Sequence, residues 1–266
     1  MSLSPTRAAT RRIRSIGRAE LLLLGRDLPA LFNALVPPFA VVVLAATAKV
    51  DHGTGLSGNA FLVTGLLGFV ILSVVYYTLV GTYVARREER VLKRLRVGEL
   101  TDAEILAGTA SPAVVIAVVQ IALYIGAGAV FLGLPVPVNV PVLALGVLGG
   151  AGVFVLLAAA STTFTRTAGM AQFTTLPVVV ACVLGSGLVM PLDILPGPVA
   201  AILRFLPLHP AVDLMRLGWL GTTGDGTPKD FVGVLGAAAV PVGILAAWTA
   251  FGVLAVRRWF RWEPRR

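Results

Sequence analysis

The stretch ILAGTASPAVVIAVVQIALYIGAGAVFLGL, residues 105–134, contains no Asp, Glu, Lys, Arg or His. It is longer than the roughly 20 apolar residues that a helix needs to cross the hydrocarbon core of a bilayer. Loop backbone cannot face lipid, because its polar groups would lack hydrogen-bond partners there. The stretch therefore predicts a membrane-spanning helix.

Five further stretches share these features, and the composition of the whole chain agrees with them. Hydrophobic residues make up 57% of the chain and charged residues 13%, well below the roughly 25% that is typical of soluble domains. We therefore predict an all-α integral membrane protein, with one domain of six transmembrane helices over residues 28–266. The expected spans are 28–48, 60–85, 105–134, 141–165, 171–192 and 231–256.

The first span follows a basic leader and ends in small residues, as a secretory signal peptide does. Its apolar run is longer than the roughly 7–15 residues of a signal peptide. We therefore expect a span that is retained in the mature protein.

Positive charge is distributed unevenly between the two sides of the expected bundle. All but four of the 22 Lys and Arg residues lie in the leader, in the 86–108 loop, at Arg166 or in the C-terminal tail. Cytoplasmic loops carry the excess of Lys and Arg in membrane proteins. We therefore expect a multi-pass protein of the cell membrane with both termini in the cytoplasm. Topology then explains the net charge of +9, and no nucleic-acid partner is expected.

The leader, residues 1–27, predicts a cytoplasmic amphipathic helix that lies on the membrane surface. At about 100° per residue, Arg11, Arg14 and Arg18 share one stripe and apolar residues lie opposite. Such a helix binds anionic membrane lipids. Glu20 falls on the apolar side, where it either reaches the headgroups or an arginine, or contacts a partner protein.

Residues 86–104 form a charged elbow between the second and third spans. Basic side chains share one side of a short predicted helix, and Leu92 and Leu95 lie on the other side. Gly98 ends this helix, and Thr101 and Glu104 have the spacing of a capping box that starts the next one. The elbow is either a solvated loop on the positive side of the membrane or a docking element for a cytoplasmic partner.

The few polar residues within the expected spans are all uncharged. Ion-coupled transporters usually need ionisable groups within the membrane, and the sequence has no phosphate-binding loop for ATP. We therefore expect the energy for any transport to come from a partner. Neutral polar side chains in spans most often form interhelical hydrogen bonds. The alternative is a substrate path, for which the candidates are Asn33, Tyr76, Tyr77, Gln120 and Gln172.

Gly146 and Gly150 in the fourth span have the G-x-x-x-G spacing that lets two helices approach closely. This spacing fits equally well with packing inside one chain and with dimerisation.

The segment after the fifth span, residues 193–229, is apolar but interrupted by prolines, which excludes a straight span. It predicts short re-entrant helices that enter the outer leaflet and return. The segment either caps the bundle or forms an outer lid. Asp213 and Arg216 are three residues apart and could pair across one helical turn. The candidate lid residues are Pro191, Pro196, Pro207, Asp213 and Arg216.

Four features, taken in order along the chain, resemble the type-2 exporter permeases of the ATP-binding-cassette (ABC) superfamily. They are the basic leader helix, the elbow REERVLKRLRVGELTDAEILAG, six spans with both ends inside, and SGLVMPLDILP followed by LPLHPAVDLMR after the fifth span. In the elbow, Arg90 stands where the family usually has Gly, and Gly98 where it has Pro. The matching residues are Arg87, Glu88, Leu92 and Leu95 in the elbow, and Gly187, Pro191, Leu195, Pro196, Pro207, Asp213 and Arg216 after the fifth span.

The resemblance implies a permease subunit that is not itself an enzyme. Two such chains, identical or related, would pair with two cytoplasmic ABC ATPase subunits. ATP and Mg would bind to the ATPase, and this chain would bind no cofactor. The implied cargo is a hydrophobic or amphipathic small molecule, such as a drug, an antibiotic or a lipid, that is exported from the cell. The residues implied in coupling to the ATPase are Arg87, Glu88, Glu89, Leu92, Leu95 and Arg96.

Two other classes of function are weighed against this one. A membrane-embedded lipid-modifying enzyme would need a cluster of catalytic side chains near the interface. No catalytic or metal-binding set is recognised, and the only two histidines, His52 and His209, lie in separate outer segments. A non-transporting immunity or scaffold protein would need no energy source at all.

Overall fold

A computed structural model describes residues 56–89, 101–165, 167–187, 192, 195–224 and 226–260 of the chain. Within these residues every regular element is a helix, which confirms the all-α fold class. The leader and the expected first span lie outside the described residues. So do the candidate residues Arg11, Arg14, Arg18, Glu20, Asn33, Leu92, Leu95, Arg96 and Pro191.

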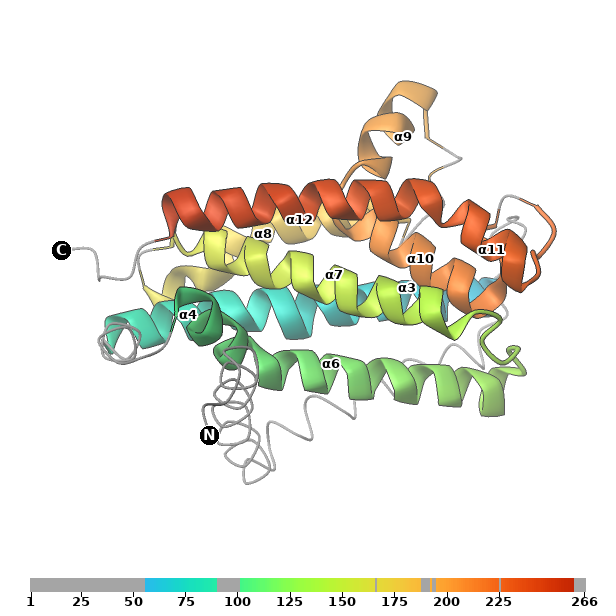
Figure 1. Ribbon diagram of the computed structural model, residues 1–266, viewed down its shortest axis with the longest axis horizontal. Coiled ribbons are helices and arrows are strands. Elements are labelled where there is room, and N and C mark those ends of the chain that lie inside the picture. Colours follow the sequence, from blue (N-terminus) through green and yellow to red (C-terminus); the bar gives the residue numbers. More distant parts are fainter. Residues whose placement is uncertain are drawn as a thin grey trace, which may run out of the picture.

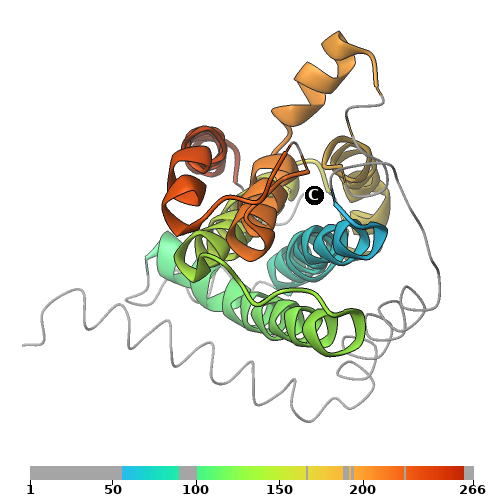
Figure 2. The same cartoon turned by 90° about the vertical axis from the view of Figure 1, so that its right-hand side faces the viewer.

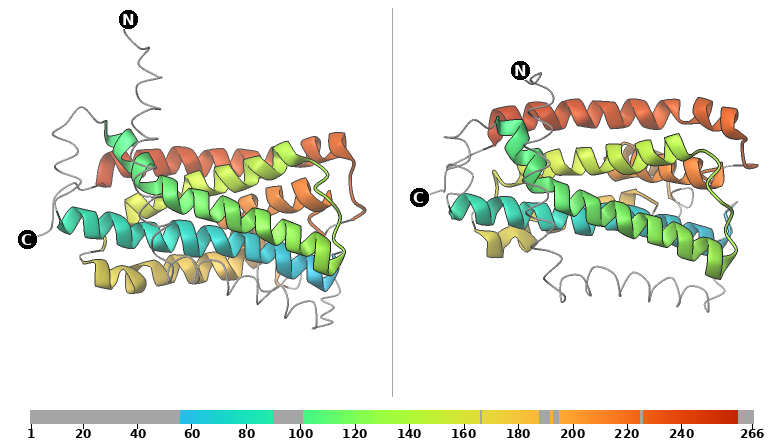
Figure 3. Two further views of the ribbon diagram at one scale, coloured as in Figure 1. Left: turned by 90° about the horizontal axis from the view of Figure 1, so that it is seen from below. Right: turned by 60° about the horizontal axis from the view of Figure 1, so that its bottom comes forward.

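The long helices run side by side along the longest axis of the molecule (Figures 1 and 3). The described residues hold five helices that are long and apolar enough to cross a membrane. They are Gly58–Glu88, which comprises α3 (Gly58–Val70), η1 (Ile71–Tyr77) and α4 (Thr78–Glu88), then α6 (Asp102–Leu132), α7 (Val140–Ser161), η2 (Ala168–Met170) with α8 (Ala171–Gly185), and α12 (Ala239–Trp259).

The helix ends differ from the expected spans for local reasons. The second helix continues to Glu88, three residues into the elbow. The fifth ends at Gly185 rather than at residue 192, because Gly187 takes a left-handed conformation with φ of 66°. The expected sixth span is divided at Ala238 into α11 (Phe231–Ala237) and α12.

The bundle has two ends, an elbow end and a pocket end. The elbow end holds Glu88, Asp102, Ser161 and Trp259, at which α4 ends, α6 begins, and α7 and α12 end. The pocket end lies opposite and holds the start of α3 and the end of α10 (Leu208–Leu220).

A short π-helix, η1, interrupts the second helix in its middle. The Thr78 hydroxyl donates to the carbonyl of Ser73, five residues earlier, at 3.1 Å, which satisfies a carbonyl in the widened turn. The turn directs Tyr76 inward, where its hydroxyl lies 2.9 Å from that of Ser161 on α7. This contact has the form of an interhelical hydrogen bond.

Two short helices, α9 (Gly197–Arg204) and α10, meet at an angle of 84°. Pro196 and Pro207 stand at the positions immediately before them, where a missing N–H leaves no helical hydrogen bond unmade. α9 projects from the bundle, whereas α10 lies inside it (Figure 2). The expected prolines thus divide the segment into helices, and its re-entry into a membrane stays a prediction.

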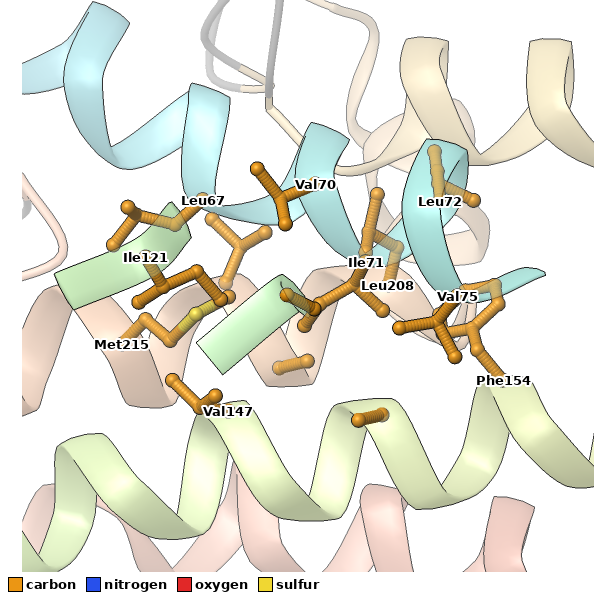
Figure 4. Close-up of a cluster of buried hydrophobic side chains, with 14 of the residues drawn as sticks. Leu67, Val70, Ile71, Leu72, Val75, Ile121, Val147, Phe154, Leu208 and Met215 are labelled. Carbon is orange, nitrogen blue, oxygen red and sulfur yellow. The ribbon is translucent and has the colours of Figure 1, made fainter. Parts of the chain in front are cut away.

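α10 is buried on nearly all sides, although it is only 13 residues long. Apart from His209 and Asp213, all of its residues are buried. Its Leu208 and Met215 join a cluster with side chains of α3, η1, α6 and α7 (Figure 4).

The Gly146–Gly150 pair of α7 explains how α10 fits into the bundle. A Cβ added at Gly146 would lie 2.9 Å from both Leu214 Cβ and the backbone nitrogen of Met215. A Cβ added at Gly150 would lie 2.8 Å from the Cβ of Ala211. Gly218 of α10 makes an equally close contact with α7, because a Cβ there would overlap the backbone of Leu143. The G-x-x-x-G spacing therefore serves packing within one chain in this structure.

Gly146→Ala should destabilise the fold by about 1–3 kcal/mol, because the added methyl group forces α7 away from α10. Gly152→Ala is the matched control, since it lies on the same helix and no described atom comes within 4 Å of its added Cβ. The control should leave the stability unchanged or raise it by up to about 1 kcal/mol. Thermal unfolding of both variants in the same detergent measures the difference. Equal melting temperatures would show that the α7–α10 contact is looser than described.

Candidate functional site

The last turn of α4 carries the Arg of the elbow motif into the interior. Arg87 is 1% exposed, and its guanidinium group points at the far end of α7. Its Nη1 donates to the carbonyl of Thr162 at 2.9 Å, and its Nη2 to the carbonyl of Thr165 at 2.6 Å. The last carbonyls of a helix have no intrahelical partner, and a cation is favourable beside them. Arg87 therefore clamps α4 to the end of α7.

The connection that Arg87 clamps, residues 162–168, also bonds to α8, to α12 and to a second residue of α4. The Thr165 hydroxyl lies 2.7 Å from that of Thr174 on α8, and the Thr163 hydroxyl donates to the carbonyl of Trp259 at the end of α12. The backbone N–H of Ala168 donates to Glu88 at 3.4 Å. A displacement of α4 therefore acts on α7, α8 and α12 together.

The other side of the elbow is fixed by the predicted capping box, which the structure confirms. The Thr101 side chain accepts from the N–H of Glu104, and the Glu104 carboxylate accepts from the N–H of Thr101 at 2.7 Å. Two hydrogen bonds connect α4 with this first part of α6: Tyr83 donates to the carbonyl of Leu106 at 3.0 Å, and Arg86 to the Thr109 hydroxyl at 3.1 Å. Both ends of the elbow are therefore anchored to the bundle.

The candidate coupling residues within the described part of the chain have different surroundings. Glu88 and Glu89 are exposed at the end of α4. Arg87 differs from the surface contact that the resemblance implies, because its guanidinium is enclosed by the bundle. Desolvation of this cation is offset by charge-assisted hydrogen bonds to carbonyls. Arg87 therefore positions the start of the elbow against the bundle.

At the pocket end, a second buried arginine joins helices that are distant in the sequence. Arg216 of α10 is 4% exposed, and its Nε donates to the hydroxyl of Thr64 on α3 at 3.0 Å. Its Nη2 donates to the carbonyl of Gly187 at 2.8 Å, which belongs to the turn after α8. The guanidinium carbon lies 4.8 Å from the centre of the Phe61 ring, within the range of a cation–π contact.

The expected pairing of Asp213 with Arg216 is not the one that the structure forms. Asp213 Oδ2 lies 3.1 Å from Nε2 of His209, one turn earlier on α10. The reason is the orientation of the helix: residues four apart share a face, and the bonds of Arg216 turn it towards α3 and the turn after α8. The two lid residues therefore have different partners.

The residues proposed as a substrate path do not converge within the described structure. Tyr76 contacts Ser161 and packs edge-on against Phe154 of α7, with ring centres 5.8 Å apart. Gln120 is buried, and its Oε1 has no hydrogen-bond partner among the described residues. Tyr77 and Gln172 are exposed on separate helices. The structure thus favours an interhelical contact for Tyr76 and leaves the path a prediction.

A pocket of about 300 Å³ lies at the pocket end beside α10. It is bounded by the start of α3, the α9–α10 turn, the connection after α10 and the start of α12, elements that surround α10 in Figure 2. Asp213 and Arg216 are the two candidate lid residues that line it.

The polar contacts that hold this end together were not predicted from the sequence. Asn139 is fully buried, caps α7 through the N–H of Val142, and donates to the carbonyl of Phe231 at 3.0 Å. The Trp219 indole donates to the carbonyl of Pro135 at 2.8 Å. An Asn followed by Pro141 is a helix-start signal that could have identified the cap. The partners of Trp219 and Thr64 are too distant in sequence to leave a local signal.

Comparison with known proteins places this arrangement in a family. A family model described as ABC-2 family transporter protein matches residues 41–257, which is most of the chain. The matched region includes every described helix up to the last turn of α12. No curated protein matches the chain.

Arg87→Met should lower the stability of the protein by about 2–4 kcal/mol, because it leaves two buried carbonyls without a donor. Arg258→Met removes the same charge from an exposed position at the same end and should change the stability little. Unfolding in detergent, followed by tryptophan fluorescence, compares the two variants. A similar loss in both would mean that Arg87 contributes charge alone and does not clamp the connection.

Proposed function

The chain belongs to the ABC-2 family of transporter proteins, and we propose that it is the permease subunit of an ABC exporter. In this proposal a separate ATPase supplies the energy, and two permease chains, identical or related, form the transport unit. The cargo is a hydrophobic or amphipathic compound, such as a drug, an antibiotic or a lipid. The elbow end faces the cytoplasm, and the pocket end faces outward.

The double hydrogen bond from Arg87 to the end of α7 is the observation that supports this mechanism best. A permease needs a stiff connection between the place where the ATPase pushes and the helices that move. Arg87 and Glu88 lie at the start of the elbow and bond to the 162–168 connection. Because that connection also bonds α8 and α12, force applied at the elbow is distributed over the bundle.

The transmitted movement would reach the pocket end through the α7–α10 contact. α7 begins at the pocket end and ends at the Arg87 clamp, so one rigid helix joins the two sites. α10 lies against the glycine surface of α7 and carries Arg216 and Asp213. Packed helices of this kind move as units, because interiors resist continuous deformation. In the proposed cycle ATP binding moves the elbow, and α10 opens the outer side.

Transport in inverted membrane vesicles should require ATP hydrolysis and should not require a proton gradient. The expected spans carry no Asp, Glu, Lys, Arg or His that could couple proton flow to transport. Replacing the phosphate-loop lysine of the partner ATPase should abolish uptake, whereas a protonophore at constant ATP should leave it intact. Loss of uptake with the protonophore alone would rule out the proposed energy source.

The same vesicles test whether the elbow couples the two subunits. We expect Leu92→Asp to lower ATP-dependent uptake by about tenfold or more, because a carboxylate on the apolar side of the elbow opposes docking on the ATPase. Leu92→Met keeps the apolar volume and is the matched control. Equal uptake by both variants, with the ATPase still bound, would make the elbow a simple solvated loop.

Single cysteines test the proposed orientation in intact cells, in a chain whose Cys182 is replaced by serine. A cysteine at Thr223, in the connection after α10, should react with a membrane-impermeant thiol reagent. A cysteine at Arg265 should react only after the cells are opened. The reverse labelling pattern would invert the topology and with it the assignment of the elbow to the cytoplasm.

A further inference from the structure

The pocket at the pocket end combines a charged side with an apolar side. Arg204, Arg216 and Lys229 line it together with the His209–Asp213 pair. Phe61 of α3 and Val240 and Ile244 of α12 line it as well. α12 is one of the helices long and apolar enough to cross a membrane, so the apolar wall continues along an apolar helix of membrane-spanning length.

The described lining residues carry an excess of positive charge. Three are permanent cations, of which Arg204 and Arg216 also have interactions of their own, and the one acid, Asp213, is paired with His209. Arg216 is held rigidly at the inner side of the pocket by Thr64, Gly187 and Phe61. The Lys229 side chain is exposed at the other side and forms no ion pair with any described residue. A pocket with this charge attracts an anion.

His209 lines the same pocket and is held in place by Asp213. Its Nε2 faces Asp213, while its Nδ1 is buried and has no hydrogen-bond partner among the described residues. Because Nδ1 is inaccessible, the His209–Asp213 pair contributes a fixed polar part of the pocket wall.

We propose that this pocket binds the anionic headgroup of an amphiphile, with the attached apolar chain lying along α12. The volume of about 300 Å³ is at the lower end of small-molecule pockets, so it suits a phosphate or carboxylate headgroup and the first part of a chain. Arginine and lysine together recognise such groups by charge-assisted hydrogen bonds. The amphiphile is either a membrane lipid or the exported cargo, and the second source rests on the proposed function.

Binding is tested on the full chain in a neutral maltoside detergent, without its ATPase. Decyl phosphate, decylphosphocholine and decanol have chains of one length and differ in headgroup charge, and inorganic phosphate has no chain. We expect decyl phosphate to bind at least about tenfold more tightly than the other three and to raise the melting temperature. Equal affinity for the three amphiphiles, or equal affinity for inorganic phosphate and decyl phosphate, would overturn the proposal.

Two variants locate the binding. Lys229→Glu should weaken decyl phosphate binding by about tenfold, and it should fold normally because only the backbone of Lys229 is bonded, to Gly221. Arg258→Glu makes the same charge change on an exposed residue at the elbow end and should not affect binding. Ile244→Trp fills the apolar wall and should weaken binding while the charges are kept. Equal effects of Lys229→Glu and Arg258→Glu would show that the anion binds to general surface charge.

The source of the amphiphile is distinguished in two further measurements. Displacement of decyl phosphate by phosphatidylglycerol identifies a membrane lipid as the ligand. Stimulation of the partner ATPase by decyl phosphate, in vesicles of phosphatidylcholine only, identifies cargo. Because binding is measured without the ATPase, a pocket that fails to bind leaves ATP-driven export untouched, and a failure of export leaves the pocket result valid.

Discussion

The close approach of α7 and α10 is the contact on which the rest of the structure depends. A Cβ added at Gly146 or Gly150 of α7, or at Gly218 of α10, would overlap atoms of the other helix. In a bilayer, where lipid is as apolar as a leucine side chain, small residues of this kind allow the van der Waals contact that holds helices together. The contact lets a helix of 13 residues lie inside the bundle rather than on its surface. Thr64 of α3 and the lining of the pocket are then arranged around α10.

Two buried arginines play similar physical roles at opposite ends of this bundle. Arg87 binds the carbonyl at the C-cap of α7 and a carbonyl of the connection that follows, and Arg216 binds a hydroxyl of α3 and a carbonyl of the turn after α8. In both cases a planar cation with several donors satisfies polar groups of other elements, a task for which the single ammonium group of lysine is less suited. Each arginine therefore makes several segments behave as one unit. The unit at the elbow end includes the C-terminal end of α7. The unit at the pocket end includes the charged side of the pocket.

In the proposed exporter, movement enters at the elbow-end unit and reaches the pocket-end unit. α7 connects them directly, since its first residue follows Asn139 at the pocket end and its last turn lies under Arg87. At the pocket end the N-cap of α7 is tied to the first residue of α11 by the hydrogen bond from Asn139 to Phe231. A pocket for an anionic headgroup beside α10 would lie where the proposed movement arrives. Binding there and ATP use at the far end would then be coupled through the packing of two helices.

The sequence by itself determined the membrane class, the family and the start of the helices that have a clear local signal. Apolar stretches of sufficient length, the Thr101–Glu104 capping box and the prolines before α9 and α10 are local signals, and local signals are readable along one chain. Tertiary structure alone decided which helix the Gly146–Gly150 surface contacts, why Asp213 faces His209 rather than Arg216, and that Arg87 points inward. Arg87 bonds to residues 75 and 78 positions away, and Arg216 to a residue 152 positions away. Such partners follow from the three-dimensional packing of whole helices. The sequence pattern within a single segment does not reveal which distant residues will lie next to it.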